Sequence, residues 1–241
     1  MASDVQHEVA SSDRNRQRTA AALSRLKLSP FGEIAIEGIH DGKTFQLLPL
    51  TSDRAEDLQL MSTLGRWRAG AQAWFPSIFP VTLEGTTRWY SKGLIEVDDR
   101  ILFLIDVDGS PLGHVGLFRF DFELMECEID NIVRGEPGWP GLIESAIRLM
   151  MAWGRSALEV ATYTLKTTSD NQRALALYAR LGFEETQRVA LVQVHEKDRT
   201  EWLPVGVEND DPVARFEVQM KQGDSGSPIR LGQTTTPAAG H

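Results

Sequence analysis

One stretch of the sequence, NQRALALYARLGF at residues 171–183, places a tyrosine on the apolar face of a predicted helix. Ala174, Leu177, Tyr178 and Leu181 follow the i, i+3, i+4, i+7 spacing of one helix face. A phenol has a pKa near 10 and a thiol near 8.5, so the tyrosine can hydrogen-bond or protonate a departing thiolate at neutral pH. The alternative is a core tyrosine whose hydroxyl finds a partner in the protein.

Two carboxylates lie two residues apart on a predicted strand. Glu128 and Asp130 therefore project from the same face, and two close carboxylates raise the pKa of one of them. Such a group can remove a proton from an ammonium, through water. The alternative is an ordinary polar pair on a solvated face. His114, on the neighbouring predicted strand, is the second candidate base, and Cys127 is expected to pack in the core.

The elements around these residues follow the order strand, loop, helix, strand, helix. A strand is predicted around 125–133, and the loop RGEPGWPG follows it. A helix from about 141 to 158 then leads to a strand at 160–167 and to the helix of Tyr178. A glycine-rich turn before a helix exposes backbone N–H groups beside the positive end of the helix dipole, and both favour phosphate. Such a turn alone is weak evidence, because Gly/Pro turns usually only redirect the chain.

The rest of the chain predicts a mostly antiparallel first half. The Asp41-Gly42 pair is typical of a tight hairpin turn. Strands flanked by helices indicate an α/β or α+β sheet domain. The further predicted elements are a hairpin over 33–50, helices over 53–67 and 82–95, an irregular connection over 74–81, two strands over 100–121, and strands near 188–195 and 214–220.

Composition excludes several classes of function. The 241 residues carry 25 Lys and Arg against 34 Asp and Glu, a net charge of −9, which disfavours a nucleic-acid surface. One cysteine rules out an internal disulfide or a cysteine metal cluster and favours the cytoplasm. No apolar run is long enough for a membrane span, and no metal site is predicted. We expect a flexible arm over 1–28, one domain over 29–222 and a disordered tail over 223–241.

The stretch that carries the tyrosine resembles the GNAT acyltransferase superfamily. The family pattern N-x-x-A-x-x-x-Y-x-x-x-G-F is matched residue for residue by Asn171, Ala174, Tyr178, Gly182 and Phe183. The resemblance covers about residues 44–220, and its sharp motifs lie within 128–183. It implies a single GNAT fold, which is a mixed, mostly antiparallel twisted sheet flanked by helices. It also implies acetyl-CoA as the cosubstrate and no metal.

The Gly/Pro loop resembles the family's Q/R-x-x-G-x-G/A pattern less closely. Aligning Gly141 with the last glycine places Glu136 where Gln or Arg is usual, and Trp139 where a glycine is usual. Backbone groups of the strand before the loop can bind the pantetheine arm, and one N–H can face the thioester carbonyl. The resemblance implies Tyr178 as general acid and these cofactor-binding residues: Asn131, Ile132, Val133, Arg134, Gly138, Trp139, Gly141, Leu142, Asn171, Ala174 and Tyr178.

The acceptor is predicted from a weaker resemblance. The segments WRAGAQAWFPSIFPVTLEGTTRWY and ECEIDNIVRG look like N-acetyltransferases of nucleotide-linked amino sugars, including those of the pseudaminic-acid pathway, and ribosomal-protein N-terminal acetyltransferases form a neighbouring branch. We expect the amine of a small amino sugar, free or nucleotide-linked. The alternatives are a protein N-terminus, or a CoA-binding domain without catalysis, and a homodimer is left open. A first-half cluster is mostly core but could hold a base and a phosphate, and His195 could contact substrate; the cluster is Trp67, Arg68, Trp74, Phe75 and Trp89.

Overall fold

The computed structural model describes residues 2–205 and 215–223, with side chains described from residue 11 onward. Apart from Gly223, the predicted disordered tail over 223–241 lies outside the described residues. Within them, no helix is both long and apolar enough to cross a membrane.

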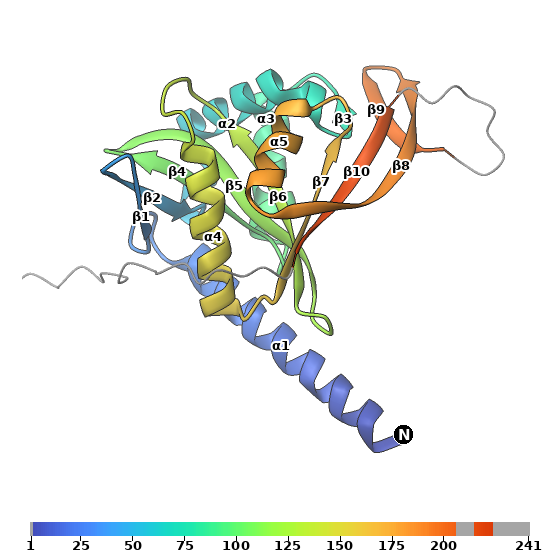
Figure 1. Cartoon of the computed structure of the whole chain (residues 1–241). Coiled ribbons are helices and arrows are strands. Elements are labelled where there is room, and N and C mark those ends of the chain that lie inside the picture. Colours follow the sequence, from blue (N-terminus) through green and yellow to red (C-terminus); the bar gives the residue numbers. More distant parts are fainter. Residues whose placement is uncertain (1, 206–214, 224–241) are drawn as a thin grey trace, which may run out of the picture.

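The described strands form one sheet in the order β1-β2-β4-β5-β6-β7-β10-β8-β9-β3 (Figure 1). All neighbours in it pair antiparallel except β6 and β7, which pair parallel. The predicted mixed, mostly antiparallel sheet is therefore confirmed. The strands are β1 Ile36–His40, β2 Lys43–Pro49, β3 Ser77–Ile78, β4 Ile101–Val107, β5 Ser110–Asp121, β6 Glu126–Arg134, β7 Thr162–Thr168, β8 Phe183–Glu196, β9 Arg199–Pro204 and β10 Arg215–Gln222.

Helices cover both faces of this sheet. Buried side chains of β4 alternate between two cores, with Phe103 and Ile105 on one side and Leu102 and Leu104 on the other. The first core is closed by α1, α4 and α5, and the second by α2 and a π-helix. The helices are α1 Ala2–Leu28, α2 Leu58–Ala71, α3 Leu83–Arg88, the π-helix Trp89–Ile95, α4 Leu142–Leu158 and α5 Gln172–Arg180, with short 3-10 turns at Ser52–Arg54 and Gln72–Trp74.

Turn residues set the two hairpins of the first half. Asp41 and Gly42 have φ of 48° and 76°, as a type I′ turn requires, and the predicted hairpin is present. Asp108 and Gly109 repeat this with φ of 53° and 77° between β4 and β5. Each aspartate–glycine pair therefore fixes the register of the strands that it joins.

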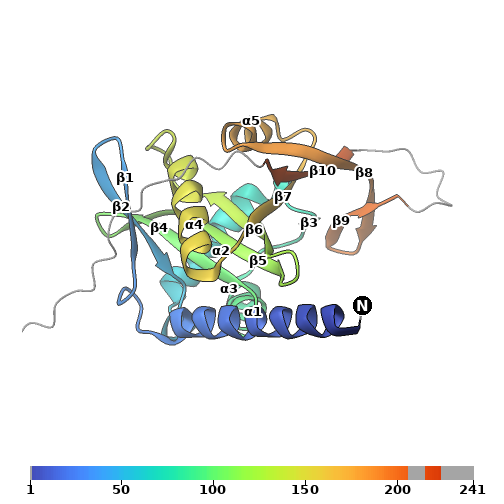
Figure 2. The same cartoon turned by 60° about the horizontal axis from the view of Figure 1, so that its bottom comes forward.

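The N-terminal residues differ from the expected flexible arm. Residues 2–28 form α1, which lies along one side of the molecule (Figure 2). Its buried side chains are Thr19, Leu23, Leu26 and Lys27, at the i, i+4, i+7, i+8 spacing of one helix face. The Lys27 Nζ donates to the Val97 carbonyl at 2.5 Å. The stripe escaped the sequence analysis because two of its four members are polar.

Three boundaries also differ from the predictions. Asp57 accepts a hydrogen bond from the Leu60 N–H at 2.9 Å, so the helix predicted over 53–67 begins later. The helix predicted over 82–95 begins at a Thr82 cap and passes into the π-helix after Arg88. The irregular connection over 74–81 contains the two-residue strand β3, which pairs with the unpredicted strand β9. Neither short strand has the apolar alternation that marks a strand in sequence.

Candidate functional site

The site lies where β6 and β7 separate. The parallel pairing runs only from Glu126 to Glu128 of β6. Beyond it, β6 continues to Arg134 and β7 to Thr168 without pairing each other. Residues 128–135 and 166–168 line a cavity of about 1510 Å³ at this point. The backbone of β6 past Glu128 thus borders a cavity on its β7 side instead of a neighbouring strand.

A bulge in β6 shapes this border. Val133 pairs with His114 and Asp130 with Gly116, so β6 carries one more residue than β5 between these pairs. Asn131 lies in the bulge with a φ of 50°, a conformation that asparagine tolerates better than most residues. Its carbonyl accepts a hydrogen bond from His114 Nδ1 at 2.7 Å. The bulge re-aims the backbone groups of β6 at the cavity.

His114 is buried, packs against the ring of Trp67 and lines the cavity. Burial lowers the pKa of its imidazole to about 4, against the partial offset of the hydrogen bond to Asn131. The ring is therefore neutral at pH 7, and the Nδ1 proton is assigned to the bond with the Asn131 carbonyl. So weak a base is poorly suited to deprotonate an ammonium, and the ring's structural contribution is to hold the bulge.

Tyr178 lines the same cavity from α5. The residue is 6% exposed, and its ring packs edge-on against Phe183. Burial raises the pKa of the phenol above its usual value of 10, so the hydroxyl stays protonated at neutral pH. This hydroxyl makes no hydrogen bond within the described part of the chain. A proton donor without a partner in the described chain thus borders the cavity. The position of Tyr178 on the apolar face of its helix would by itself also suit a core residue.

Asn171 and Ala174 accompany Tyr178 on α5. Asn171 is the N-cap, and its Oδ1 accepts a hydrogen bond from the Ala174 N–H at 3.2 Å. Both residues also line the cavity, next to Thr167 and Thr168 of β7. Asn171 therefore caps α5, and the first turn of this helix borders the cavity.

The two candidate carboxylates line the cavity but have different partners. Asp130 pairs with Arg100, and its oxygens also accept hydrogen bonds from the Asn131 N–H at 2.8 Å and from Asn131 Nδ2 at 2.7 Å. Glu128 pairs only with the exposed Arg119, at 3.1 Å. The two do not form an isolated acidic pair. Asp130 is held in place by three contacts, whereas Glu128 keeps more freedom.

The loop after β6 is tied to α2. Glu136 occupies the position where the family pattern has Gln or Arg, and it accepts hydrogen bonds from Trp67 Nε1 at 2.8 Å and Arg66 Nη2 at 2.5 Å. These donors lower the pKa of Glu136, which stays ionised. Arg134 donates to two carbonyls of the same loop, those of Glu136 and Gly138. At the position where the family pattern has a Gln or Arg, this chain therefore has a glutamate that fastens the loop to α2.

The predicted cofactor residues divide into two groups. Four of them do not line the cavity: Leu142 is buried in the core, Trp139 packs against it under Lys43, Gly141 begins α4, and Gly138 lies in the exposed loop. His40 bonds the Pro140 carbonyl and Ser145 Oγ, both at 2.9 Å, beside the start of α4. The predicted residues that line the cavity are Asn131, Ile132, Val133, Arg134, Asn171, Ala174 and Tyr178.

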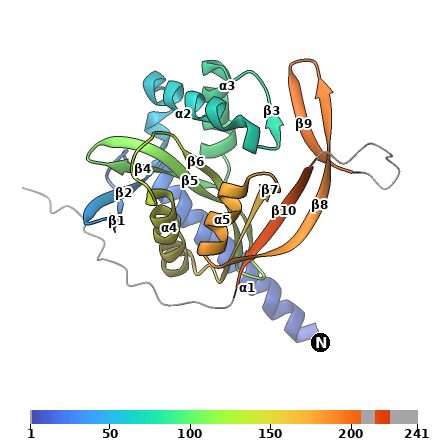
Figure 3. The ribbon, with the colours of Figure 1, turned by 45° about the horizontal axis from the view of Figure 1, so that its top comes forward.

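The far wall of the cavity is built from the first half of the chain and from the β8–β9 hairpin. Ser77 and Ile78 pair with Glu201 and Thr200, and Figure 3 shows β9 reaching β3 beside α2 and α3. His195, for which the sequence allowed a contact with substrate, bonds Thr200 Oγ1 on this hairpin and does not line the cavity. The lining residues that sequence reasoning missed include Arg88, Arg100, Arg119, Lys166, Arg199, Trp202 and Glu217.

Most of these missed residues carry no signal in sequence. Lys166 lies on β7 and Glu217 on β10. Because side chains alternate between the two faces of a strand, the sequence could have assigned each of these residues to a face of its own strand. Arg199 and Trp202 depend on the pairing of β9 with β3, which joins segments more than a hundred residues apart. No group of three or more His, Cys, Asp or Glu side chains able to hold a metal ion occurs in the described part of the chain.

Comparison with known proteins agrees with this geometry. The model of the acetyltransferase (GNAT) domain matches residues 45–184. An uncharacterized N-acetyltransferase of Methanocaldococcus jannaschii is 32% identical over 111 residues, 42% of this chain and 47% of the relative. Spermidine N(1)-acetyltransferase of Escherichia coli is 26% identical over 128 residues, 53% of this chain and 68% of the relative. The match to the archaeal relative spans about half of that protein's length.

Solved structures show the same fold at low identity. Spermidine N-acetyltransferase from Vibrio cholerae, crystallised with CoA and spermine, superposes with a TM-score of 0.56 at 17% identity, covering 73% of this chain and 94% of that one. The ribosomal L7/L12 alpha-N-protein acetyltransferase RimL gives a TM-score of 0.55 at 14% identity, covering 81% and 98%. With its family model matched over more than half of its length, the chain belongs to the GNAT acetyltransferase family.

Proposed function

We propose that the protein transfers an acetyl group from acetyl-CoA to the amine of a small acceptor. The observation that carries this proposal is the position of Tyr178. The residue is buried, and its hydroxyl, without a partner in the described chain, borders the cavity where the backbone of β6 leaves β7. The cytoplasm is the compartment expected from the single cysteine.

The residues at the bulge fit the donor. Acetyl-CoA supplies a thioester whose carbonyl carbon the amine attacks and whose sulfur leaves as a thiolate. Residues 131–133 line the cavity and have no strand partner on the β7 side. The Asn131 N–H and carbonyl already bond Asp130 and His114, so the backbone groups that can hold an extended pantetheine arm are those of Ile132 and Val133. An N–H fixed by the bulge costs no reorganisation when it stabilises a developing oxyanion. Arg134, at the end of β6, offers the nearby positive charge that phosphate groups need.

Tyr178 and Glu128 divide the proton transfers. We assign the acid to Tyr178, whose hydroxyl is protonated and free to donate toward a thiolate. We assign the base to Glu128, acting through water, because it lines the cavity and has one ion-pair partner, the exposed Arg119. Asp130 accepts three contacts, and the pKa of His114 near 4 makes that ring a weak base.

A small amino sugar, free or nucleotide-linked, is the acceptor that we propose. The closure of the far wall by β3 and β9 favours a small molecule over a folded protein, because the pairing at Ser77 and Ile78 encloses that side of the cavity. Aromatic side chains on this wall, among them Trp74, Phe79 and Trp202, offer faces on which a sugar or a base can stack. Transfer to a protein N-terminus, or CoA binding without transfer, are the alternatives that the experiment must separate.

The test is a CoA-release screen with acetyl-CoA and four acceptor classes: free amino sugars, nucleotide-linked amino sugars, spermidine, and peptides with free N-termini. We expect turnover with amino sugars and product mass increased by one acetyl group. Turnover confined to peptides, or to spermidine, would replace the proposed acceptor. Binding of acetyl-CoA without turnover in any class would favour a non-catalytic domain.

A further inference from the structure

The cavity wall contains an arginine without an anionic partner. Arg68 lines the cavity from α2, and it has no carboxylate partner among the described residues. Six other basic residues that line the cavity do have one: Arg66 with Glu136, Arg88 with Glu84, Arg100 with Asp130, Arg119 with Glu128, Lys166 with Glu217, and Arg199 with Glu201. Arg134 and Arg173 also line the cavity without an ion pair among the described residues, but both are exposed, whereas Arg68 is half-buried.

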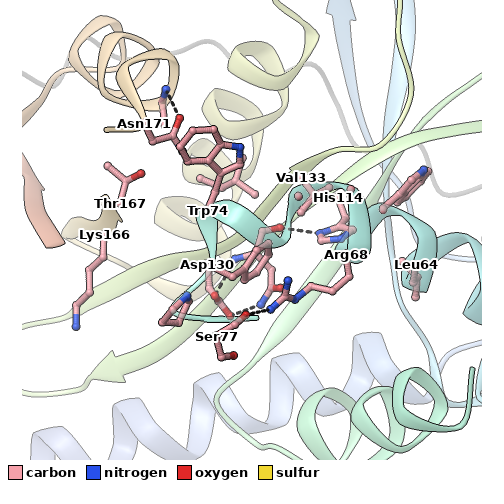
Figure 4. A pocket seen from close by; sticks show the side chains of 18 of the residues that line it. Leu64, Arg68, Trp74, Ser77, His114, Asp130, Val133, Lys166, Thr167 and Asn171 are labelled. Atoms are coloured by element: carbon pink, nitrogen blue, oxygen red, sulfur yellow. Dashed lines mark hydrogen bonds between the residues drawn. The ribbon is translucent and has the colours of Figure 1, made fainter. Parts of the chain in front are cut away.

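The guanidinium of Arg68 is fixed in position. Its Nη2 donates to the Ser77 carbonyl at 2.7 Å, as Figure 4 shows, and its Cζ atom lies 3.9 Å from the ring centre of Phe75 and 5.1 Å from that of Phe79. Nη1 is buried and makes no hydrogen bond within the described chain. A rigid guanidinium with unused donors loses little conformational freedom when it binds an anion.

The electrostatic state of Arg68 is costly without an anion. Burial lowers the pKa of this guanidinium to about 10, which leaves it charged at pH 7. A partly buried charge that lacks a counter-ion destabilises the folded protein, and such groups are found at functional sites. The wall at Arg68 therefore favours an anionic ligand over a cationic one.

The neighbouring side chains add an apolar surface to this charge. Trp74 is 46% exposed and projects into the pocket (Figure 4). Phe79 and Trp202 line the same wall. A planar base or a sugar ring can stack on such faces while its phosphate meets a planar guanidinium.

We infer that Arg68 binds a phosphoryl group of the acceptor, so that the substrate is a phosphorylated or nucleotide-linked amine and not a polyamine. This inference rests on the proposed function and narrows its acceptor. A polyamine would place its charges beside an unpaired cation. The carboxylates that line the cavity, Glu128, Asp130 and Glu217, already face Arg119, Arg100 and Lys166.

The first test measures binding to the CoA-saturated protein, in which the donor's own phosphate sites are filled. Glucosamine, glucosamine 6-phosphate, UDP-glucosamine and spermidine are titrated by calorimetry into the wild type, Arg68→Gln and Arg88→Gln. Arg88 is a matched control because it lines the cavity, is exposed and is paired with Glu84. We expect at least one phosphorylated probe to bind the wild type, and Arg68→Gln to weaken it about 10- to 100-fold, the range for a charge-assisted pair.

The controls give the converse expectation. Glucosamine affinity should be equal in all three proteins, and Arg88→Gln should bind the phosphorylated probe as the wild type does. A glucosamine 6-phosphate response indicates a sugar phosphate, and a response confined to UDP-glucosamine indicates a nucleotide-linked sugar. The inference is overturned if no phosphorylated probe binds, if Arg68→Gln binds it normally, or if spermidine binds more tightly.

A second variant at the same position keeps the test valid if Arg68→Gln fails to fold. Arg68→Lys keeps the charge but loses the planar fork, so its affinity for the phosphorylated probe should fall by a smaller factor. Unchanged affinity in this variant would also contradict the inference. Steady-state acetylation separates the two proposals. A raised KM with little change in kcat for Arg68→Gln supports the inference. Phosphate binding without turnover in any protein refutes only the proposed reaction.

Discussion

Replacement of Tyr178 by phenylalanine gives the most direct test of the proposed chemistry. The substitution keeps the ring, which is 6% exposed and packs edge-on against Phe183 at a centroid distance of 6.4 Å. It removes only a hydroxyl that makes no hydrogen bond within the described residues. The free energy of unfolding should therefore change by less than about 1 kcal/mol, which is the typical value of one hydrogen bond.

Turnover should respond very differently. Loss of a general acid typically lowers the rate by about 10²- to 10⁴-fold, or roughly 3–5 kcal/mol of transition-state stabilisation. Acetyl-CoA affinity should stay within about tenfold, because the proposed contacts to the pantetheine arm come from the backbone of Ile132 and Val133. The assay combines urea unfolding, calorimetric titration of CoA, and CoA release under saturating acceptor, all on one preparation of each protein.

The opposite pattern would refute this reasoning. A tyrosine with only a packing role predicts near-normal turnover at unchanged stability, since phenylalanine keeps the ring and the lost hydroxyl has no partner within the described residues. Phe183→Leu is a useful control, because it alters the ring that packs against Tyr178 and leaves the hydroxyl in place. This control should lose stability and retain most of its turnover per folded molecule.

Three further predictions concern the residues around this tyrosine and the first helix. The pKa of His114 is about 4 in the fold and 6.5 unfolded, so the unfolded state binds the extra proton as pH falls. Wild-type stability should thus decrease by about 3 kcal/mol between pH 6.5 and 4, and His114→Phe should remove this slope in urea unfolding. Leu23→Ala should cost about 2–5 kcal/mol, while Leu28→Ala, at a site 69% exposed, should stay within about 0.5 kcal/mol. Glu128→Gln should lower kcat by about 10²-fold or more at unchanged melting temperature. Asp130→Asn should instead lower the melting temperature, because it weakens the ion pair with Arg100. Equal melting temperatures in these two variants would contradict the roles assigned.

Several elements of the fold were predictable because their signals are local. The Asp41-Gly42 turn, the helix over about 141–158 and the apolar face of α5 are each specified by nearby residues, and each appears in the structure. The first helix was not predictable in the same way. Its buried stripe includes Thr19 and Lys27. The Lys27 ammonium can be buried there because it donates hydrogen bonds to the carbonyls of Ile95 and Val97, which lie far away in the sequence.

The candidate site divides along the same line. A motif within one helix predicted that Asn171, Ala174 and Tyr178 share a surface, and all three line the cavity. The loop after β6 was harder to predict, because Glu136 stands where the family pattern has Gln or Arg. Its role becomes visible only with Trp67 and Arg66, which lie about seventy residues earlier and donate to its carboxylate.

The wall of the cavity that faces the proposed acceptor shows why the substrate is the property hardest to predict from sequence. The charge of the whole chain is −9, which would suggest an affinity for cations such as polyamines. The local balance differs, because the cavity carboxylates are paired and Arg68 is not. That imbalance depends on Ser77, which is held by the pairing of β3 with β9 and accepts a hydrogen bond from the guanidinium. If Arg68 selects the acceptor as we propose, specificity depends on a non-local strand pair, whereas the motif that predicts the reaction lies in one short helix.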